Sequence, residues 1–144
     1  MAGDAAQWMV RDFERVPGEF PIRTFLEGLE GRDANEAAAL LVKLAARGNQ
    51  LRPPDSKALV GQRNLFELRG HQVRIFYMFR PGREIVLLDG IVKQQDRIPA
   101  SDLARVGGYQ REVDRRGSAV PPGERRAAGT ECRRRPGSPK GGQR

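Results

Sequence analysis

Apolar residues recur at helical spacing in two neighbouring segments of the N-terminal third of the chain. The first segment begins at Pro21, because proline is favoured at the first position of a helix, and it ends at Gly31. The second segment follows a capping pair, Asp33 with Glu36, and ends at Gly48. Each segment carries one apolar stripe, formed by Ile22, Phe25, Leu26 and Leu29 in the first and by Ala37, Leu40, Leu41 and Leu44 in the second. The pattern predicts a helical hairpin whose apolar faces pack on a sheet.

Strand-like segments lie on either side of this hairpin. Residues 8–16 alternate loosely and predict a first strand, and residues 65–69, 73–80 and 84–93 are rich in β-branched and aromatic residues. Turn-forming residues at 70–72 and at 81–82 separate the last three strands, which favours two successive hairpins. Pro99 then opens a final helix over residues 100–116. The predicted class is α+β: an N-terminal strand, a helical hairpin packed on a small antiparallel sheet, and a C-terminal helix.

The composition changes near Gly117. Residues 117–144 are rich in Gly, Pro and Arg and hold a single aliphatic residue larger than alanine, so they cannot bury enough apolar surface to offset the entropy of ordering. We therefore predict one folded domain over residues 1–116 and a disordered basic tail over residues 117–144.

The charge of the chain is concentrated in its C-terminal half. The net charge is +8, and residues 1–56, 57–116 and 117–144 contribute −2, +5 and +5. A basic bias within the folded part favours a polyanionic partner such as RNA. Cys132 has no second cysteine to pair with, and His71 is the single histidine, which argues against disulfides and a zinc site. No segment has the length and apolar character of a membrane span or the order of a signal peptide, so we expect a cytoplasmic protein without contact to a membrane.

Strand alternation predicts which residues of the first hairpin share a face. A turn over residues 70–73 sets Leu68 against Ile75, which builds an apolar face, and it places Arg69 directly across from Arg74 on the other face. For the second hairpin, a two-residue turn at 81–82 sets Ile75 against Leu88, Tyr77 against Val86, and Arg74 against Asp89, with Lys93 on the same face as Arg74.

Two arginines opposite each other on a sheet repel, and a bound anion would explain the arrangement. A guanidinium is a planar fork suited to phosphate oxygens, and it can stabilise the charge that develops in phosphodiester cleavage. Lys57 and Arg97 would add further positive charge for RNA binding. In the alternative interpretation, Asp89 neutralises Arg74 and Glu67 pairs with a neighbouring cation, which leaves an ordinary solvated face. Tyr77 is expected in the core and His71 in a solvated turn.

The chain resembles the RelE/ParE superfamily of toxin–antitoxin toxins, in particular its HigB-like and phage-derived branch. Three segments over residues 8–116 carry the resemblance: Lys57-Ala58-Leu59 leading to Leu65-Phe66-Glu67-Leu68-Arg69, then Val73-Arg74-Ile75-Phe76-Tyr77, then Leu87-Leu88-Asp89-Gly90-Ile91-Val92-Lys93 followed by Pro99.

The resemblance implies a type II toxin that cleaves mRNA, usually on the ribosome, without a metal ion or other cofactor. In such an endoribonuclease the 2′-hydroxyl of the RNA attacks the adjacent phosphate while basic residues stabilise the transition state. Arg74, Arg69 and Lys93 then match the catalytic positions, and Lys57 matches the basic residue that precedes the sheet. The implied partners are mRNA and a cognate antitoxin, often a helix-turn-helix protein.

Two other functions remain open. One is a ParE-like toxin that inhibits a gyrase-type target by contact and cuts no RNA. The other is an inactivated relative that only binds antitoxin or RNA; Gln94 in place of a second lysine, and the lack of a histidine or other base after the last strand, favour this alternative.

Overall fold

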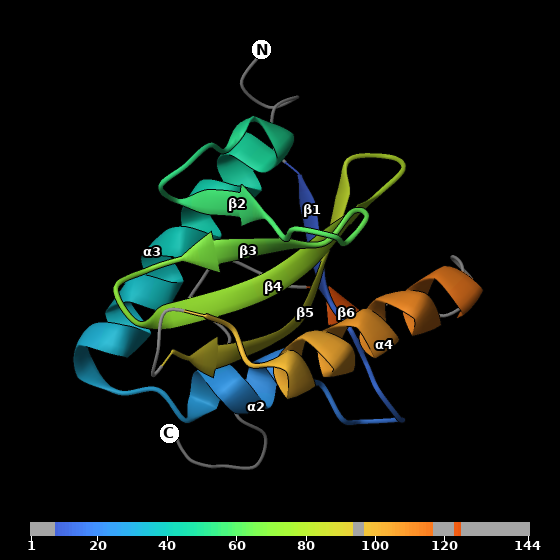
Figure 1. Cartoon of the computed structure of the whole chain (residues 1–144), viewed down its shortest axis with the longest axis horizontal. Helices are drawn as coiled ribbons and strands as arrows, with labels where there is room; N and C mark the ends of the chain where they lie inside the picture. The colour runs from blue at the N-terminus through green and yellow to red at the C-terminus, as the bar shows by residue number, and fades with distance from the viewer. Residues whose placement is uncertain (1–7, 94–96, 117–122, 125–144) are drawn as a thin grey trace, which may run out of the picture.

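The computed structural model describes residues 8–93, 97–116 and 123–124 of the chain. A mixed sheet lies at its centre and helices cover both faces (Figure 1). In chain order the elements are β1 (Met9–Asp12), α2 (Pro21–Glu27), α3 (Gly31–Arg47), the 3-10 turn η1 (Gly48–Gln50), β2 (Ser56–Ala58), β3 (Phe66–Arg69), β4 (Val73–Arg80), β5 (Glu84–Val92), α4 (Ala100–Arg116) and β6 (Gly123–Glu124). The predicted α+β class and element order are confirmed, and β2 and β6 are additions.

The sheet has six strands in the order β2-β3-β4-β5-β1-β6. Strands β2 to β5 form an antiparallel meander, whereas β1 pairs with β5 in parallel, Met9 opposite Glu84. The N-terminal strand is therefore next to the last strand of the meander, and β6 adds to its outer edge. The described pair Gly123–Glu124 is thus part of the sheet, which corrects the prediction of a disordered tail for these two residues; residues 117–122 and 125–144 lie outside the described part of the chain.

Each face of the sheet has its own apolar core. Helices α2 and α3 cover one face, where Ile22 and Leu44 meet Leu68, Ile75 and Tyr77. Helix α4 covers part of the other face, where Val106 and Val113 meet Phe76, Met78 and Leu88. The sequence predicted the first core but treated the second face as open to solvent. None of the helices in the described part of the chain is long and apolar enough to cross a membrane.

Helix α3 begins two residues before the predicted capping pair. Its N-cap is Glu30, no side chain caps it, and Asp33 lies inside the first turn. The predicted capping role of Asp33 and Glu36 is therefore wrong. Glu36 instead accepts a hydrogen bond from the backbone N–H of His71 at 2.8 Å, and so ties α3 to the turn between β3 and β4.

The first hairpin has the register predicted from alternation. Phe66 lies opposite Tyr77, Leu68 opposite Ile75, and Arg69 opposite Arg74. The turn closes with a hydrogen bond from Gly70 N–H to the carbonyl of Val73, at 2.9 Å.

The second hairpin has a different register from the predicted one. Its turn holds three residues between Arg80 and Glu84, and a bulge shifts the pairing at Phe76 and Tyr77. Gly82 and Arg83 both adopt left-handed backbone conformations, φ 86° and 61°, which closes this longer turn. As a result, Val86 and Leu88 face α4 rather than the α2–α3 core, and Asp89 lies opposite Phe76 rather than Arg74.

Gly48 at the end of α3 is required by both its backbone and its surroundings. Its φ is 51°, and a Cβ built there would lie 2.0 Å from the Trp8 ring. We expect Gly48→Ala to destabilise the protein by about 3 kcal/mol, from left-handed strain together with overpacking. Gly61→Ala is the matched control, because Gly61 has φ 81° with nothing within 4 Å of its Cβ position. Urea denaturation checks the difference; equal losses in the two variants would contradict a role for the Trp8 contact.

Candidate nucleic-acid interface

The predicted arginine pair lies at the turn end of the β3–β4 hairpin. Arg69, the last residue of β3, is directly across from Arg74, the second residue of β4. Glu67 lies two residues before Arg69 on the same face of β3, so its side chain approaches both guanidinium groups. We call Glu67, Arg69 and Arg74 the arginine cluster.

Arg74 is the buried member of the cluster. Only 5% of the residue is exposed, and its Nη1 donates hydrogen bonds to the carbonyls of Gly70 at 2.6 Å and Val73 at 3.0 Å. Burial lowers the pKa of Arg74, against the opposing effect of Glu67. An arginine nevertheless stays protonated at physiological pH. Arg74 is therefore a fixed positive charge under the surface, and the prediction that it lies on an open face is corrected.

Glu67 is the counter-charge inside the cluster. Its carboxylate lies 3.6 Å from Nε of Arg74 and 3.8 Å from Nε of Arg69. Neither contact is a hydrogen bond: Oε1 of Glu67 and Nε of Arg69 are buried atoms with no hydrogen-bond partner among the described residues. Of the predicted neutralising carboxylates, Glu67 thus pairs with the arginines, whereas Asp89 does not.

The exposed cations around the cluster are Arg69 and Lys57. The Arg69 side chain is 37% exposed, and Lys57 is exposed on β2, directly across from Glu67. Strands β2, β3 and β4 therefore bring Lys57, Arg69 and Arg74 onto one face, as their matching to the resemblance implied.

Lys93 and Arg97 lie beyond the end of β5. The backbone N–H of Lys93 donates to the carbonyl of Gln72 at 2.6 Å, which places Lys93 beside the β3–β4 turn. Arg97 is exposed, and no printed contact joins it to the cluster. Gln94 lies among residues 94–96, outside the described part of the chain. The structure thus groups Lys93 with the arginine turn and leaves Arg97 without such a link.

Sequence reasoning missed one contributor to this site, Glu36. Its carboxylate packs against Gly70, where a Cβ would lie 2.6 Å from it, and its charge acts on Arg74. A carboxylate in the middle of α3 has no local signal that distinguishes it from a solvated helix residue. His71, by contrast, is exposed in the turn, as expected.

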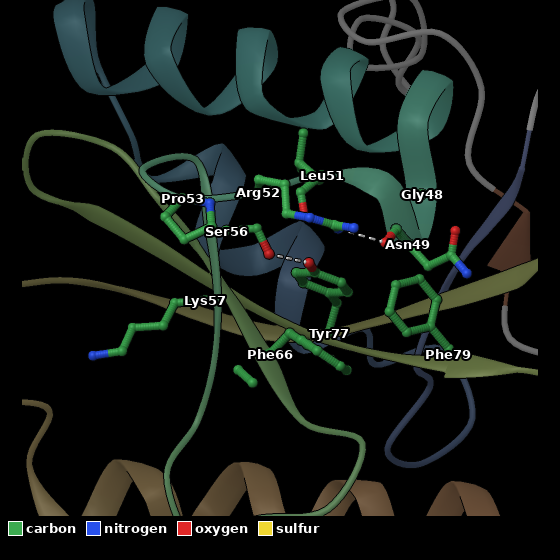
Figure 2. A pocket seen from close by; sticks show the side chains of 11 residues that line it. Gly48, Asn49, Leu51, Arg52, Pro53, Ser56, Lys57, Phe66, Tyr77 and Phe79 are labelled. Atoms are coloured by element: carbon green, nitrogen blue, oxygen red, sulfur yellow. Dashed lines mark hydrogen bonds between the residues drawn. The ribbon is translucent and has the colours of Figure 1, made fainter.

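A pocket of about 190 Å³ lies on the other face of the sheet, between η1 and strands β2 to β4 (Figure 2). Phe66, Tyr77 and Phe79 form its aromatic side, and Ser56 Oγ is hydrogen-bonded to the Tyr77 hydroxyl at 2.6 Å. The Lys57 side chain points away from the pocket (Figure 2). Tyr77 is 1% exposed, which confirms its prediction as a core residue, and burial raises the pKa of its hydroxyl.

Asp89 belongs to a separate group that fastens α4 to β5. It accepts a hydrogen bond from Arg105 at 3.1 Å, and Arg105 also bonds Asp102 at 2.6 Å. Among the described residues, no group of three or more His, Cys, Asp or Glu side chains is arranged to hold a metal ion.

Burial raises the pKa of Asp89 above its ordinary value, although Gly90 N–H and Arg105 oppose the shift. A raised folded-state pKa means that Asp89 favours folding at acidic pH and that this contribution is lost as pH rises through the folded pKa. We therefore expect the stability of Asp89→Asn relative to wild type to improve between about pH 4 and pH 7. Urea denaturation across this range measures it; a relative stability that falls with rising pH would show the opposite sign.

Comparison with known proteins places the chain in a family. Residues 24–107, more than half of the chain, match the family described as Phage derived protein Gp49-like (DUF891), and the chain belongs to this family. The recognition of a phage-derived branch of RelE/ParE relatives is thereby confirmed.

Among solved structures, the chain is similar to one in the crystal structure of the toxin-antitoxin complex RelBE2 from Mycobacterium tuberculosis. The two share 20% sequence identity with a TM-score of 0.41, over 62% of this chain and 95% of that one. No curated protein matches the chain.

Proposed function

We propose that the chain is the toxin of a type II toxin–antitoxin system and that it cleaves mRNA by a metal-independent reaction, on the ribosome. The observation that carries the proposal is the pairing of Arg69 with Arg74 beside exposed Lys57. Membership of the Gp49-like family supports it. The proposed partners are mRNA and a cognate antitoxin, and the proposed location is the cytoplasm.

In the proposed reaction the 2′-hydroxyl of one nucleotide attacks the adjacent phosphorus and loses its proton. The bond from phosphorus to the 5′-oxygen breaks, which leaves a 2′,3′-cyclic phosphate and a 5′-hydroxyl that gains a proton. Negative charge develops on the nonbridging oxygens in the transition state. Positive groups already fixed in place stabilise such charge without reorganisation.

The exposure of the cations divides the work among them. Arg69 and Lys57 are open to solvent and are the groups we assign to direct phosphate contact. Arg74, which is 5% exposed, contributes its charge from beneath and holds the turn through its bonds to Gly70 and Val73. Lys93, beside the turn, and exposed Arg97 extend the basic surface along the RNA.

Induced expression followed by primer-extension mapping of mRNA tests the proposal. Growth arrest with new mRNA ends, abolished in Arg69→Ala, is the expected result. Arrest without new ends would replace this function with that of a contact inhibitor of a gyrase-type target. Neither arrest nor new ends would identify an inactivated relative that binds only antitoxin or RNA.

A further inference from the structure

Glu67 is the residue in the cluster to which no role in cleavage has been given. It is 5% exposed, and its neighbours across the sheet are Lys57 on β2 and Phe76 on β4. We propose that Glu67 is a positioning residue that holds the guanidinium groups of Arg69 and Arg74 together for the phosphate. This inference rests on the proposed ribonuclease function and adds a residue to it.

The first argument is electrostatic. Two guanidinium groups on directly opposed residues repel each other, and Arg74 is removed from the water that would screen its charge. The carboxylate of Glu67 lies within 4 Å of both. It therefore offsets the repulsion and allows the two positive charges to stay adjacent before any RNA is bound.

The second argument concerns the geometry of the two ion pairs. At 3.6 and 3.8 Å they are charge contacts without hydrogen bonds, and Nε of Arg69 is left without a hydrogen-bond partner among the described residues. A carboxylate that accepted hydrogen bonds from both guanidiniums would compete with a phosphate for the same donors. Glu67 thus neutralises charge while donor capacity on Arg69 remains for a ligand.

The third argument is that Glu67 is too covered to be a catalytic residue. A general base must come within hydrogen-bond reach of the 2′-hydroxyl, directly or through one water. The side chain of Glu67 is 7% exposed and its Oε1 is buried. Its position under the two arginines fits support of the groups that touch RNA rather than contact with RNA itself.

A positioning role predicts opposite effects on binding and on chemistry. Glu67→Gln keeps the size of the side chain and removes its charge, so the cluster becomes more positive. We expect the toxin concentration that gives half-maximal cleavage to fall by about threefold, because RNA is attracted more strongly. The cleavage rate at saturating toxin should fall by about tenfold to 100-fold, because the guanidiniums lose their alignment.

The experiment measures single-turnover cleavage of mRNA on programmed ribosomes, with purified full-length toxin over a range of concentrations. Asp89→Asn is the matched control, since Asp89 is also a buried carboxylate paired with an arginine but lies under α4. Glu67→Asp restores the charge on a shorter side chain and should recover part of the saturating rate. NMR signals of the Arg69 and Arg74 Nε–H groups should move in Glu67→Gln and stay in place in Asp89→Asn.

Each result decides the matter differently. A lower saturating rate with unchanged or tighter half-saturation, together with moved guanidinium signals, supports positioning. Faster cleavage in Glu67→Gln would overturn it and make Glu67 a brake on RNA binding, and an equal loss in Asp89→Asn would reduce it to general destabilisation. Wild-type protein that cleaves no mRNA would overturn the proposed function, and the role of Glu67 with it, whereas wild-type cleavage with an unaffected Glu67→Gln would overturn the role of Glu67 alone.

Discussion

Replacing Arg69 with alanine is expected to lower the rate of mRNA cleavage by about 100-fold or more while the protein stays folded. Arg69 is at the end of β3 with 37% of its side chain exposed, and the described residues give it no hydrogen bond through Nε. The variant therefore loses a donor to the phosphate and little packing. Single-turnover cleavage on ribosomes and a urea unfolding curve together measure the two expectations.

Two further variants sharpen this test. Arg69→Lys keeps the positive charge but loses the planar fork, so an intermediate rate is expected if bidentate phosphate contact matters. Arg115→Ala removes one positive charge from an exposed arginine of α4 and should cleave at the wild-type rate. A loss in Arg115→Ala equal to that in Arg69→Ala would attribute the effect to net charge and contradict a specific role for Arg69.

Replacing Arg74 with alanine is expected to lower the free energy of unfolding by about 3–5 kcal/mol. The Arg74 side chain is 6% exposed, and its loss leaves the buried carboxylate of Glu67 without its nearer partner. It also removes the hydrogen bonds to the carbonyls of Gly70 and Val73. Urea denaturation measures the loss, and non-toxic Arg74→Ala cells would then reveal nothing about catalysis.

A double variant separates folding from chemistry at this position. Glu67→Leu with Arg74→Met replaces the buried charges by apolar side chains, which is often neutral or stabilising in proteins. We expect it to recover most of the stability lost in Arg74→Ala and to remain inactive in cleavage. Full cleavage by a stable double variant would show that neither Glu67 nor Arg74 contributes to the reaction.

The sequence predicted the half of the sheet in which local turn chemistry and alternation agree. In the first hairpin, Leu68 and Ile75 are both apolar and Arg69 and Arg74 both charged, so a single register satisfies both faces. In the second, residues 85–88 are all apolar and any register buries them, so the turn alone had to set the pairing. A three-residue turn with a bulge was then indistinguishable from a two-residue turn.

The second face of the sheet was missed for a related reason. Helix α4 carries Gly107, Gly108 and several charged residues, and its apolar residues are too few to announce a helix that packs on a sheet. Strand β2 was missed because Ser56, Lys57 and Ala58 include no β-branched or aromatic residue. Without these two elements the sequence places Arg74 correctly opposite Arg69 but cannot predict that it is buried.

The parallel pairing of β1 with β5 has a consequence for the order in which the protein is made. Met9 is synthesised early, yet its strand partner Glu84 emerges from the ribosome only after the whole β2–β4 segment. Helix α4 closes the fold later still, since Arg116 donates to the carbonyl of Glu14 at 2.7 Å. The β3–β4 hairpin, by contrast, joins residues close in sequence and pairs with little loop-closure entropy. During translation we therefore expect Arg69 and Arg74 to meet before the N-terminal strand finds its place, so a nascent chain acquires its arginine cluster ahead of its complete core.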